Sequence, residues 1–530
     1  MNYWEKRASF LENKNFQKSN DLIRLIDKEH KLAMKKIESD IDFYLSRIAK
    51  EGNLSIAEAR KLLSKGELDH FRMSLGDYIE AGKGSLTDEI KSQLELASNL
   101  HHISRQQAMA IELKKHIDSL YNKYLGETTK YLATSYEESF YQSLYDLGKF
   151  EGFKSFQKLN TIEIDSIIKR PWAEDGQNFS DRIWKNQEKL INSLQEELLG
   201  SAMRGDKIDR AIKNLAEKME VSKSNASRLI RTESAFISNL AMTNAYEKGT
   251  CEKYEILATL DLKTSEICRH MDGKKFPFKD KLVGVNHPPF HPNCRTVTIP
   301  CYDDDIERRL DEKSGRLTRD PETGKSKPVE NLTYKKWYNK YIRDNPEAIF
   351  KEKAWKNRQA DKKQFSKYRN VLGEDLKNNF KDFQEIKHKD EDKYRLIKID
   401  YKRRKKLIDN PNLLLPNVDK AYIDKRKFTE YLFGGTNQDG LIKGSLINKK
   451  LGYNINNYKE FEEEILIRAR IYPAKLKTTG KYGSKYETRT IFYGKNEEPV
   501  NVEIGWLVNG DKTHLTSIYI NEVNKGDFKD

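Results

Sequence analysis

The first 250 residues carry the hydrophobic pattern of long amphipathic helices. Between residues 22 and 49, apolar side chains recur every three or four positions with charged residues between them. Segments 92–148 and 184–218 repeat this periodicity, and no proline precedes Pro171. Because proline breaks the hydrogen-bond ladder of a helix, its absence allows long continuous helices. We expect these helices to pack on one another or on a partner protein.

The pattern changes after residue 250. KYEILATLD at 253–261 and TVTIP at 296–300 predict two strands, and the segment between them holds two glycines and four prolines. This predicts a small α+β domain closed by a turn-rich loop. After Tyr302 the chain is highly charged up to about residue 415, which predicts weakly hydrophobic helices, linkers and an exposed loop at 319–328.

The C-terminal part predicts a compact domain of its own. IDKRKFTEYLF and YKEFEEEILIRARIY have helical patterns, whereas YETRTIFYG, NVEIGWLV and HLTSIYI alternate as antiparallel strands joined by short turns. The whole chain is therefore expected to be a multi-domain α+β protein, since 530 residues are too many for one core. The expected parts are a mainly helical N-terminal region, a small α+β domain, a charged basic helical linker and a C-terminal α+β domain, at 1–205, 206–305, 306–415 and 416–530.

Charge and hydropathy narrow the classes of function. The net charge is +15, and residues 351–410 hold 20 Lys and Arg against 11 Asp and Glu. Such a segment fits contact with a phosphate backbone, although a solvated helix face of mixed charge gives the same composition. No apolar run is long enough for a membrane-spanning segment. The first residues lack the apolar core of a signal peptide and the chain has four cysteines, so we expect synthesis in a cytosol.

HPPFHPNCR, residues 287–295, is rich in proline and in residues that bind metals. His291 and Cys294 have the two-residue gap found in one half of many zinc sites, and Cys268 lies upstream. His287 or His270 would supply a fourth ligand. The alternative is a proline-fixed turn that binds no metal, since three prolines force a loop here in either case.

Several motifs in a fixed order carry a family resemblance. RLIRTESAFISNLAMTNAYEKG, ATLDLKTSEICRHMDGKKF and GVNHPPFHPNCRT follow one another, after NYWEKR at 2–7 and PWAEDGQNFSDRIWKNQEKL at 171–190. Together they resemble the phage head morphogenesis family, the minor head (minor capsid) proteins with a MuF-type domain. The resemblance covers roughly residues 1–305 and is more specific than any single motif.

The resemblance assigns individual residues. Arg231, Thr232 and Glu233 match the family's RTE on a helix, and Asp272 with Gly273 match its DGK turn. The family's cysteine and H-x-x-C-R positions fall on Cys268, His291, Cys294 and Arg295. Many members have a further cysteine where this chain has Ser265, so one expected metal ligand is absent. No motif supplies a nucleophile with a base, so we expect residues 1–305 to be structural rather than enzymatic.

The resemblance implies a place and partners. It implies a low-copy virion component in the phage head interior near the portal, made in the bacterial host cytoplasm, that acts in head morphogenesis and in DNA packaging or ejection. The long helices would contact the portal protein and the capsid interior. The basic segment would contact phage double-stranded DNA without sequence preference.

The C-terminal module carries a second resemblance. YLFGGTNQDGLIKGSLINKKLGY and the strands ending in HLTSIYI are similar to nuclease domains of the barnase, EndoU, colicin and RelE type, over about 416–523. This implies a ribonuclease that acts on RNA and is delivered into the host by the virion; a binding module is the alternative. Residue types suited to proton transfer and phosphate neutralisation are Lys443, Arg489, His514, Thr516 and Tyr519. His514 and Thr516 share one face of a strand, and Tyr519 faces away unless a bulge intervenes.

Overall fold

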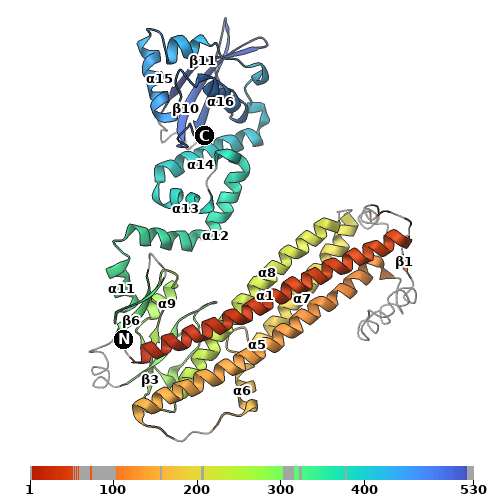
Figure 1. Ribbon diagram of the computed structural model, residues 1–530, viewed down its shortest axis with the longest axis vertical. Helices are drawn as coiled ribbons and strands as arrows, with labels where there is room; N and C mark the ends of the chain where they lie inside the picture. The colour runs from red at the N-terminus through yellow and green to blue at the C-terminus, as the bar shows by residue number, and fades with distance from the viewer. Residues whose placement is uncertain are drawn as a thin grey trace. The chain divides into compact units, whose positions relative to one another are not determined.

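The computed structural model divides the chain into two compact units, Met1–Asp344 and Asn345–Asp530, which are described separately here (Figure 1). The structure describes residues 3–51, 103–154, 158–204, 208–302, 315–320, 325–376 and 379–521, with isolated residues between 53 and 73. A four-stranded C-terminal sheet and two-thirds helical content confirm the expected multi-domain α+β class.

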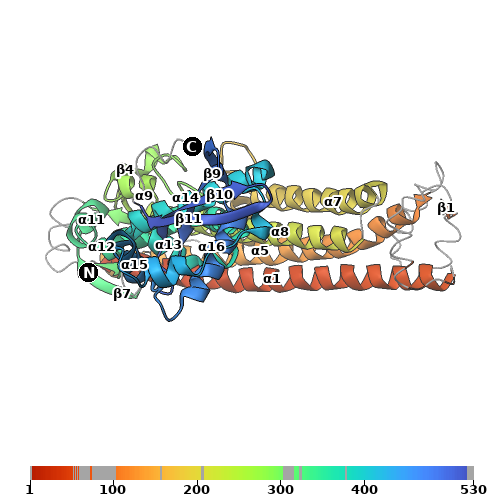
Figure 2. The same cartoon turned by 90° about the horizontal axis from the view of Figure 1, so that it is seen from above.

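Four long helices form the body of unit 1 and lie side by side in two views (Figures 1 and 2). They are α1 (Tyr3–Glu51), α5 (Arg105–Glu151), α7 (Phe179–Arg204) and α8 (Ile208–Tyr246). The short helix α6 (Thr161–Ile168) packs on α5. Their apolar stripes meet in one core, so the amphipathic pattern of the sequence is satisfied within the chain. Core residues from the four helices include Ile26, Ile37, Ile117, Leu132, Ile183, Leu194, Leu215 and Ile237.

A seam of small polar side chains runs through this helical core. Asn15 on α1 donates to the hydroxyls of Ser139 on α5, at 3.2 Å, and Ser238 on α8, at 2.6 Å. Farther along, Ser222 on α8 lies 3.0 Å from the His30 ring nitrogen Nε2. Each group is buried and paired with another helix, so sliding one helix by a turn would leave polar atoms without partners. The seam therefore fixes the register of the bundle.

The small α+β domain packs at the end of the bundle where α1 begins. Its sheet has the order β4-β3-β5, from β3 (Lys253–Leu257), β4 (Lys275–Pro277) and β5 (Val297–Cys301), with all pairs antiparallel. Helix α9 (Glu266–Met271) and the 3-10 turn η1 (Phe278–Asp280) lie in the connections. The two strands expected in this region are thus confirmed. Strand β5 packs against α8 and α1, which joins the domain to the bundle.

Unit 1 extends beyond the expected boundary at residue 305. A hairpin of β6 (Gly315–Arg319) and β7 (Ser326–Glu330) flanks the expected loop, and helix α11 (Tyr334–Tyr341) follows. Far from this end, β1 (Arg72–Met73) pairs with β2 (Ile103–Ser104). The hydrophobic pattern of the sequence did not predict the hairpin or α11, because the 306–344 segment is highly charged. The hairpin belongs to unit 1 because β6 packs against α1 and because Arg316 on β6 donates to the Ala258 carbonyl after β3 and to Asp272 after α9.

The helices expected as a linker pack with the C-terminal module. These are α12 (Pro346–Leu372), α13 (Phe380–Lys389) and α14 (Glu391–Asp409), with 3-10 turns η2 (Gly373–Asp375), η3 (Pro411–Leu413) and η4 (Val418–Lys420). They form a small core of their own with Phe383 at its centre. The structure therefore places a compact unit at 345–530, where the sequence suggested a linker up to 415 and a module from 416.

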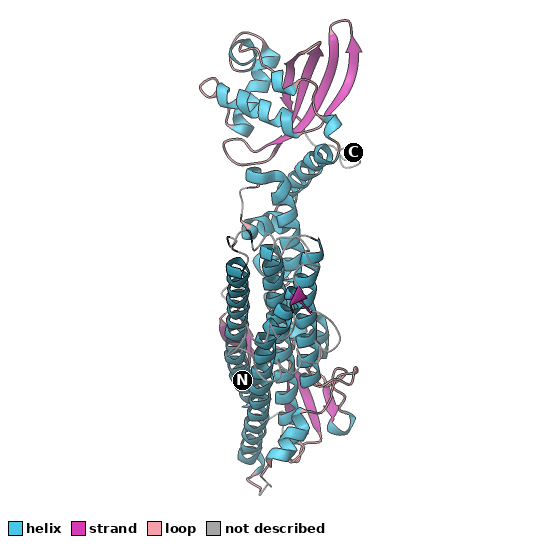
Figure 3. Ribbon diagram, turned by 90° about the vertical axis from the view of Figure 1, so that its right-hand side faces the viewer, coloured by secondary structure: helices cyan, strands magenta, loops and turns pink. Residues whose placement is uncertain are grey.

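The C-terminal sheet has the order β11-β10-β9-β8 and is antiparallel throughout. Its strands are β8 (Ala474–Gly480), β9 (Gly483–Phe492), β10 (Val500–Asn509) and β11 (Lys512–Ile520). The three strands expected here are confirmed, and β8 is an additional edge strand. Helices lie against one face of the sheet (Figure 3). They include the π-helix η5 (Lys427–Leu432), α15 (Gln438–Leu451) and α16 (Tyr458–Ile471).

Two glycines allow α15 to cross η5 closely. A Cβ atom at Gly440 or Gly444 would overlap the carbonyl oxygens of Tyr431 and Leu432. The two glycines are four residues apart and therefore share one face of the helix. This close approach brings Lys443 on α15 beside Tyr431 on η5.

A buried ion network joins the linker helices to the module. The Asp375 carboxylate accepts from both terminal nitrogens of Arg468 on α16, each at 2.7 Å, and from Arg404 on α14 at 2.5 Å. Arg404 also donates to Asp400 at 2.8 Å, which accepts from the Tyr493 hydroxyl after β9 at 2.9 Å. Losing one partner of such a buried network costs about 3–5 kcal/mol. The helices from 346 onward are thus part of the folded module.

Across the part of the chain that the structure describes, every long helix carries too many charges, or too little apolar length, to cross a membrane.

Candidate functional site

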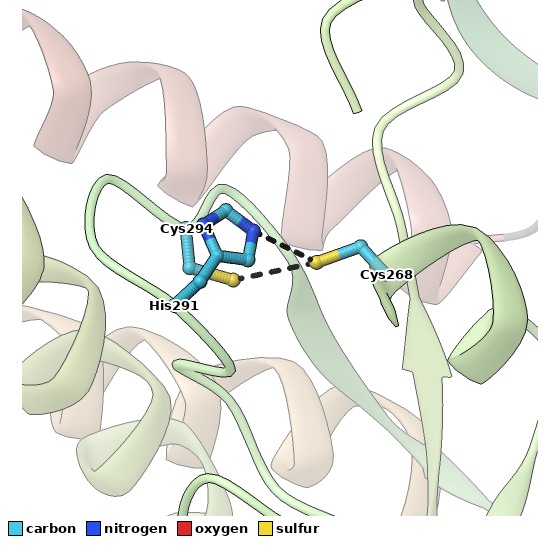
Figure 4. Close-up of side chains that lie close together, drawn as sticks. All are labelled: Cys268, His291 and Cys294. Carbon is cyan, nitrogen blue, oxygen red and sulfur yellow. Dashed lines mark hydrogen bonds between the residues drawn. The ribbon is translucent and has the colours of Figure 1, made fainter. Parts of the chain in front are cut away.

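Cys268, His291 and Cys294 converge in unit 1 (Figure 4). Cys268 lies on α9, and the other two lie on the proline-rich loop before β5. The Cys268 sulfur lies 3.2 Å from His291 Nε2 and 3.7 Å from the Cys294 sulfur. Both cysteines are buried and the histidine is partly exposed. The structure thus assembles the three residues that the sequence singled out as metal ligands.

The local sequence explains why His291 and Cys294 face the same point. The Cys294 amide donates to the His291 carbonyl at 3.2 Å, which closes a β-turn across Pro292 and Asn293. Asn293 has a φ of 59°, as a type II turn requires at its third residue, and proline suits the second. Such a turn brings its first and last side chains together. On the other side, Ser265 caps α9 and accepts from the Cys268 amide.

The spacing of the cluster suits a tetrahedral zinc ion. Two sulfurs bound at about 2.3 Å in tetrahedral geometry lie about 3.8 Å apart, close to the 3.7 Å between Cys268 and Cys294. The cluster supplies three ligands, and the hydroxyls of Ser265 and Thr296 interact with the Cys268 sulfur from the side. These residues would hold Zn²⁺ and leave its fourth position to a water molecule or a hydroxyl.

The two histidines considered as fourth ligands lie outside the cluster. His287 is buried against the Tyr254 ring, and its Nε2 lies 3.4 Å from the Thr243 hydroxyl. Burial lowers the pKa of His287 to about 3, so it stays neutral. His270 is exposed on the far part of α9. His287 therefore packs the loop against α8 and does not reach the metal cluster.

Hydrogen bonds within the cluster favour one thiolate. The Cys268 thiol and the His291 ring both lower the pKa of Cys294, because both can donate to its sulfur. The Cys294 sulfur raises the pKa of Cys268 in turn, and burial adds to this effect. Cys294 also raises the pKa of His291. A thiolate is the form of cysteine that binds metals, and these contacts favour that form at Cys294.

The RTE motif on α8 ties three segments together. Arg231 donates to Asn20 on α1 at 3.2 Å. The Thr232 hydroxyl accepts from the Asn293 amide, within the metal-binding turn, at 3.1 Å. Glu233 is buried and accepts from the Trp172 indole at 2.9 Å. The three residues match the family's motif and anchor the bundle, the loop and the PWAEDG segment, so the structure gives each of them a structural role.

The DGK turn and Arg295 are also anchors. Asp272 receives two hydrogen bonds from Arg316 on β6, at 2.8 and 3.0 Å, and others from the amides of Ala258 and Tyr334. Gly273 follows it with a φ of 78°, which favours glycine. Arg295 forms a two-pronged, partly buried ion pair with Asp261 at 2.5 and 2.8 Å. These charges hold the loops in place.

A cavity of about 700 Å³ lies between these anchored segments. It is lined by Trp172 and Arg182, by the Thr232–Glu233 turn of α8, and by the loop around His291. Glu233 is its most deeply buried charge, and burial raises the pKa of this carboxyl to about 7.

The register of β11 shows how three predicted residues of the C-terminal module, His514, Thr516 and Tyr519, lie relative to one another. A bulge on β11 leaves Thr516 opposite no residue of β10, because Gly505 pairs with Ser517 and Trp506 with Leu515. The extra residue shifts the alternation of side chains between the two faces by one position. His514 and Tyr519 therefore lie on the same face of the sheet although they are five residues apart. They pair with Leu507 and Glu503, four residues apart, so they are separated by about 13 Å along the strand.

Arg489, Glu503 and Tyr519 form a row across three strands, on the face of the sheet opposite the core residues Ile504 and Trp506. The Tyr519 hydroxyl donates to Glu503 at 2.7 Å, and Arg489 Nε lies 3.3 Å from the other carboxylate oxygen. The Glu503 hydrogen bond raises the pKa of Tyr519 to about 12. Lys443 reaches this row from α15, with its Nζ 6.0 Å from the centre of the Tyr519 ring. His514 instead packs beside Tyr422.

Sequence reasoning missed Glu503 and Glu487, which pair with Arg489. Glu487 lies two residues before Arg489 on β9 and accepts from its Nε at 3.0 Å. The signal that would find Glu503 is the strand register, because it is directly opposite both Arg489 and Tyr519. The register of β11 can be worked out only if the bulge at Thr516 is known, and the sequence pattern does not show this bulge.

Comparison with known families gives a match for the part of unit 1 that contains α8 and the small α+β domain. Residues 192–299 match the family described as Phage Mu protein F like protein. The match supports a Mu F-like domain in this segment. The segment contains all of α8 with the RTE motif, strands β3 and β4, the beginning of β5, and Cys268, His291 and Cys294. The match supports a protein of phage head morphogenesis and confirms the resemblance carried by the motifs.

Matches outside the Mu F-like domain are less specific. Residues 414–522 match a family described as a domain of unknown function, DUF6883, so the nuclease resemblance stays a prediction. One curated relative is the NAD(+)-arginine ADP-ribosyltransferase EFV of Enterococcus faecalis (strain ATCC 700802 / V583), 24% identical over 231 residues. The alignment covers 41% of this chain, which spans 45% of the relative's length. No solved structure matches.

We predict that the purified protein binds about one Zn²⁺ per chain through Cys268, His291 and Cys294. Elemental analysis of the wild type and of Cys294→Ser should show that the variant loses the metal. Cys251→Ser is the matched control, because Cys251 is a buried cysteine outside the cluster. Well under one zinc per wild-type chain, or equal zinc in wild type and Cys294→Ser, would contradict the prediction.

The buried Glu233 predicts a pH dependence of stability. Its pKa is raised from 4.5 to about 7, so the folded protein binds a proton that the unfolded chain has released between these values. This contribution is fully present below pH 4.5 and is lost as the pH rises through 7. Between pH 5 and 8, the free energy of unfolding should fall by roughly 1–3 kcal/mol less in Glu233→Gln than in the wild type. The glutamine keeps an acceptor for Trp172.

Urea denaturation at several pH values, followed by circular dichroism of the helices, measures this slope. Glu12 will keep part of the slope in the variant, because burial also raises its pKa to about 7. Glu247→Gln is the control, since Glu247 forms an ion pair of partly exposed side chains with Lys281. Identical slopes for wild type and Glu233→Gln would show that Glu233 does not titrate in this range.

Proposed function

We propose that this protein is a minor head protein of a bacteriophage, present in few copies in the head interior near the portal, with roles in head morphogenesis and in DNA packaging or ejection. The observation that carries the proposal is the Mu F-like domain, whose RTE motif ties the long helices and the metal loop into one unit. The bundle and the domain therefore act together. The remaining question is which surfaces meet the portal, the capsid and the DNA.

A stripe on α1 supports a protein partner for the bundle. Phe10, Leu32 and Phe43 are 50%, 43% and 63% exposed, although each is large and apolar. At 100° per residue their spacings place them within about 60° of one another on the helix. Large apolar side chains gathered on one face of a helix are typical of a protein contact. The stripe suits docking on the portal or the inner capsid surface.

Helix α12 supports contact with duplex DNA. Its two interior acidic residues, Glu352 and Asp361, are buried, so every exposed charge between Lys353 and Arg369 is positive. The exposed cations are Lys353, Lys356, Arg358, Lys362, Lys363, Lys367 and Arg369. A helix whose exposed charges have one sign can contact the phosphates of DNA without reading its sequence.

The experiment for the virion role is mass spectrometry of purified virions before and after DNA release. The proposal predicts that this chain is present in full virions at a few copies per portal, far below the major capsid protein. Its absence from virions would contradict the proposal. Comparison of full and emptied particles also shows whether the chain leaves with the DNA.

The DNA contact predicts a defined salt dependence. Replacing Lys362, Lys363 and Lys367 with glutamine should make the plot of log affinity against log salt less steep, by about 0.9 for each lysine that contacts a phosphate. The matched control replaces Lys425, Lys449 and Lys450, which are exposed cations elsewhere in unit 2. Fluorescence anisotropy with a random-sequence duplex measures both slopes. Equal slopes for the two triple variants would exclude α12 as the DNA contact.

A second candidate activity is favoured by the Arg489–Glu503–Tyr519 row, and it is cleavage of RNA. In this scheme the RNA 2′-hydroxyl passes its proton to the Tyr519 oxygen while Tyr519 passes its own proton to Glu503. The 2′-oxygen bonds to phosphorus, the bond to the 5′-oxygen breaks, and Lys443 protonates the leaving oxygen. Arg489 neutralises the charge on the phosphate. The products are a 2′,3′-cyclic phosphate and a 5′-hydroxyl end.

The scheme predicts distinct effects of single substitutions on RNA cleavage. Tyr519→Phe and Glu503→Gln should each lower the rate by about 10²- to 10⁴-fold, because each removes one step of the proton transfer. His514→Ala should leave it nearly unchanged, since His514 is about 13 Å from Tyr519 along the strand. Cleavage of a labelled RNA by the full chain measures the rates. Equal activity of wild type and Tyr519→Phe would indicate contamination and defeat the scheme.

A further inference from the structure

A cavity of about 470 Å³ lies in unit 2 between α14 and the edge of the C-terminal sheet. Lys402, Arg403 and Lys406 line it from α14, and residues 473–476 line it from the start of β8. Lys406 comes four residues after Lys402 and three after Arg403, so it lies on the same side of the helix as both. Its size falls within the usual range of small-molecule sites, about 300–1,000 Å³.

The charge of this cavity is strongly positive. Lys402, Lys406 and Lys475 form no ion pair with any residue that the structure describes. Glu487 is the one acidic residue in the lining, and it already accepts hydrogen bonds from Lys477, outside the cavity lining, and from Arg489. Cations brought together in a concave site repel one another unless an anion joins them. The composition therefore points to an anionic ligand with more than one negative oxygen.

The cavity also has an apolar floor. Ile399 and Leu413 line it from the side of α14, and Pro473 and Leu476 line it from the strand. Leu476 is 50% exposed, so its side chain is accessible to a ligand. A free phosphate would use the cations and leave this surface in water. A ligand with a flat apolar part joined to a phosphate would use both, as a nucleotide does.

The position of the cavity links it to the Arg489–Glu503–Tyr519 row. Arg489 and Glu487 line the cavity and also belong to the open face of the sheet. An RNA strand bound in the cavity would reach the Arg489–Glu503–Tyr519 row within one or two nucleotides. Bases of a duplex are stacked and paired and cannot enter such a site, whereas an unpaired base can.

We propose that this cavity is a binding site for one unpaired nucleotide of a single-stranded RNA, with its phosphate on Lys402 and Lys406 and its base on Leu476. The site rests on the proposed RNA activity for the choice of RNA, and it binds a neighbour of the nucleotide that is cleaved. It is separate from the duplex contact on α12, because it is concave and admits only an unstacked base.

The test uses the full chain carrying Glu503→Gln, so that RNA stays intact during the measurement. The probe is a fluorescein-labelled RNA tetranucleotide that contains one 4-thiouridine. Lys402→Gln with Lys406→Gln should weaken its binding at least tenfold, and Leu476→Glu should do the same by placing a carboxylate on the apolar floor. Photo-crosslinks should map to peptides that contain residues 397–413 or 473–489.

The matched control is Lys449→Gln with Lys450→Gln, which removes the same charge from exposed positions on α15 and should change tetranucleotide binding less than threefold. Equal losses in the two double variants, or crosslinks confined to other peptides, would overturn the proposal. So would binding of the matched DNA tetranucleotide as tight as that of RNA, because the site is proposed for RNA. Binding with these properties by a chain whose wild-type form cleaves no RNA would retain the site and reject the nuclease scheme.

Discussion

Three consecutive residues on α8 determine how unit 1 is assembled. Successive side chains of a helix point about 100° apart, so Arg231, Thr232 and Glu233 face three directions and meet α1, the metal-binding turn and Trp172. Each contact is a hydrogen bond to a segment distant in sequence. The metal cluster depends on this arrangement, because the turn that carries His291 and Cys294 is held through Thr232. A short motif can therefore be characteristic of a family because of the contacts that hold the fold together.

Unit 2 depends in a similar way on Asp375, at the end of α12. Two arginines from different helices converge on this single carboxylate, and Arg404 continues the network to Asp400 and the tyrosines beside the sheet. The desolvation of these charges is compensated only while all partners are present. The basic helices and the sheet therefore fold as one body. This places the α12 cations and the cavity beside α14 on the same compact unit as the Arg489–Glu503–Tyr519 row, without a flexible linker between them.

The sequence predicted what depends on local pattern and missed what depends on register or on charge placement. The long helices, strands β3, β5, β9, β10 and β11, and the residues Cys268, His291 and Cys294 follow from periodicity, turn residues and motif order, whereas the short strand β4 and the edge strand β8 were not predicted. The β6–β7 hairpin was hidden because its strands are polar, and the linker was expected because Glu352, Asp361 and Asp400 were counted as surface charges although they are buried. Glu503 was missed because its place opposite Tyr519 depends on the bulge at Thr516.

The two units use their charged residues differently, and this difference separates structural from ligand-binding sites. In the Mu F-like domain the motif charges Asp272, Arg295 and Glu233 are each bonded to another segment of the chain. Such groups stabilise the fold and have little capacity left for a ligand. In unit 2, Lys402 and Lys406 line a cavity without a carboxylate partner among the described residues, so their charges can still be neutralised by a bound anion. This criterion separates charges that hold the fold together in the first unit from charges in the second unit that remain available to an anionic ligand, and it is the basis for proposing the nucleic-acid sites in unit 2.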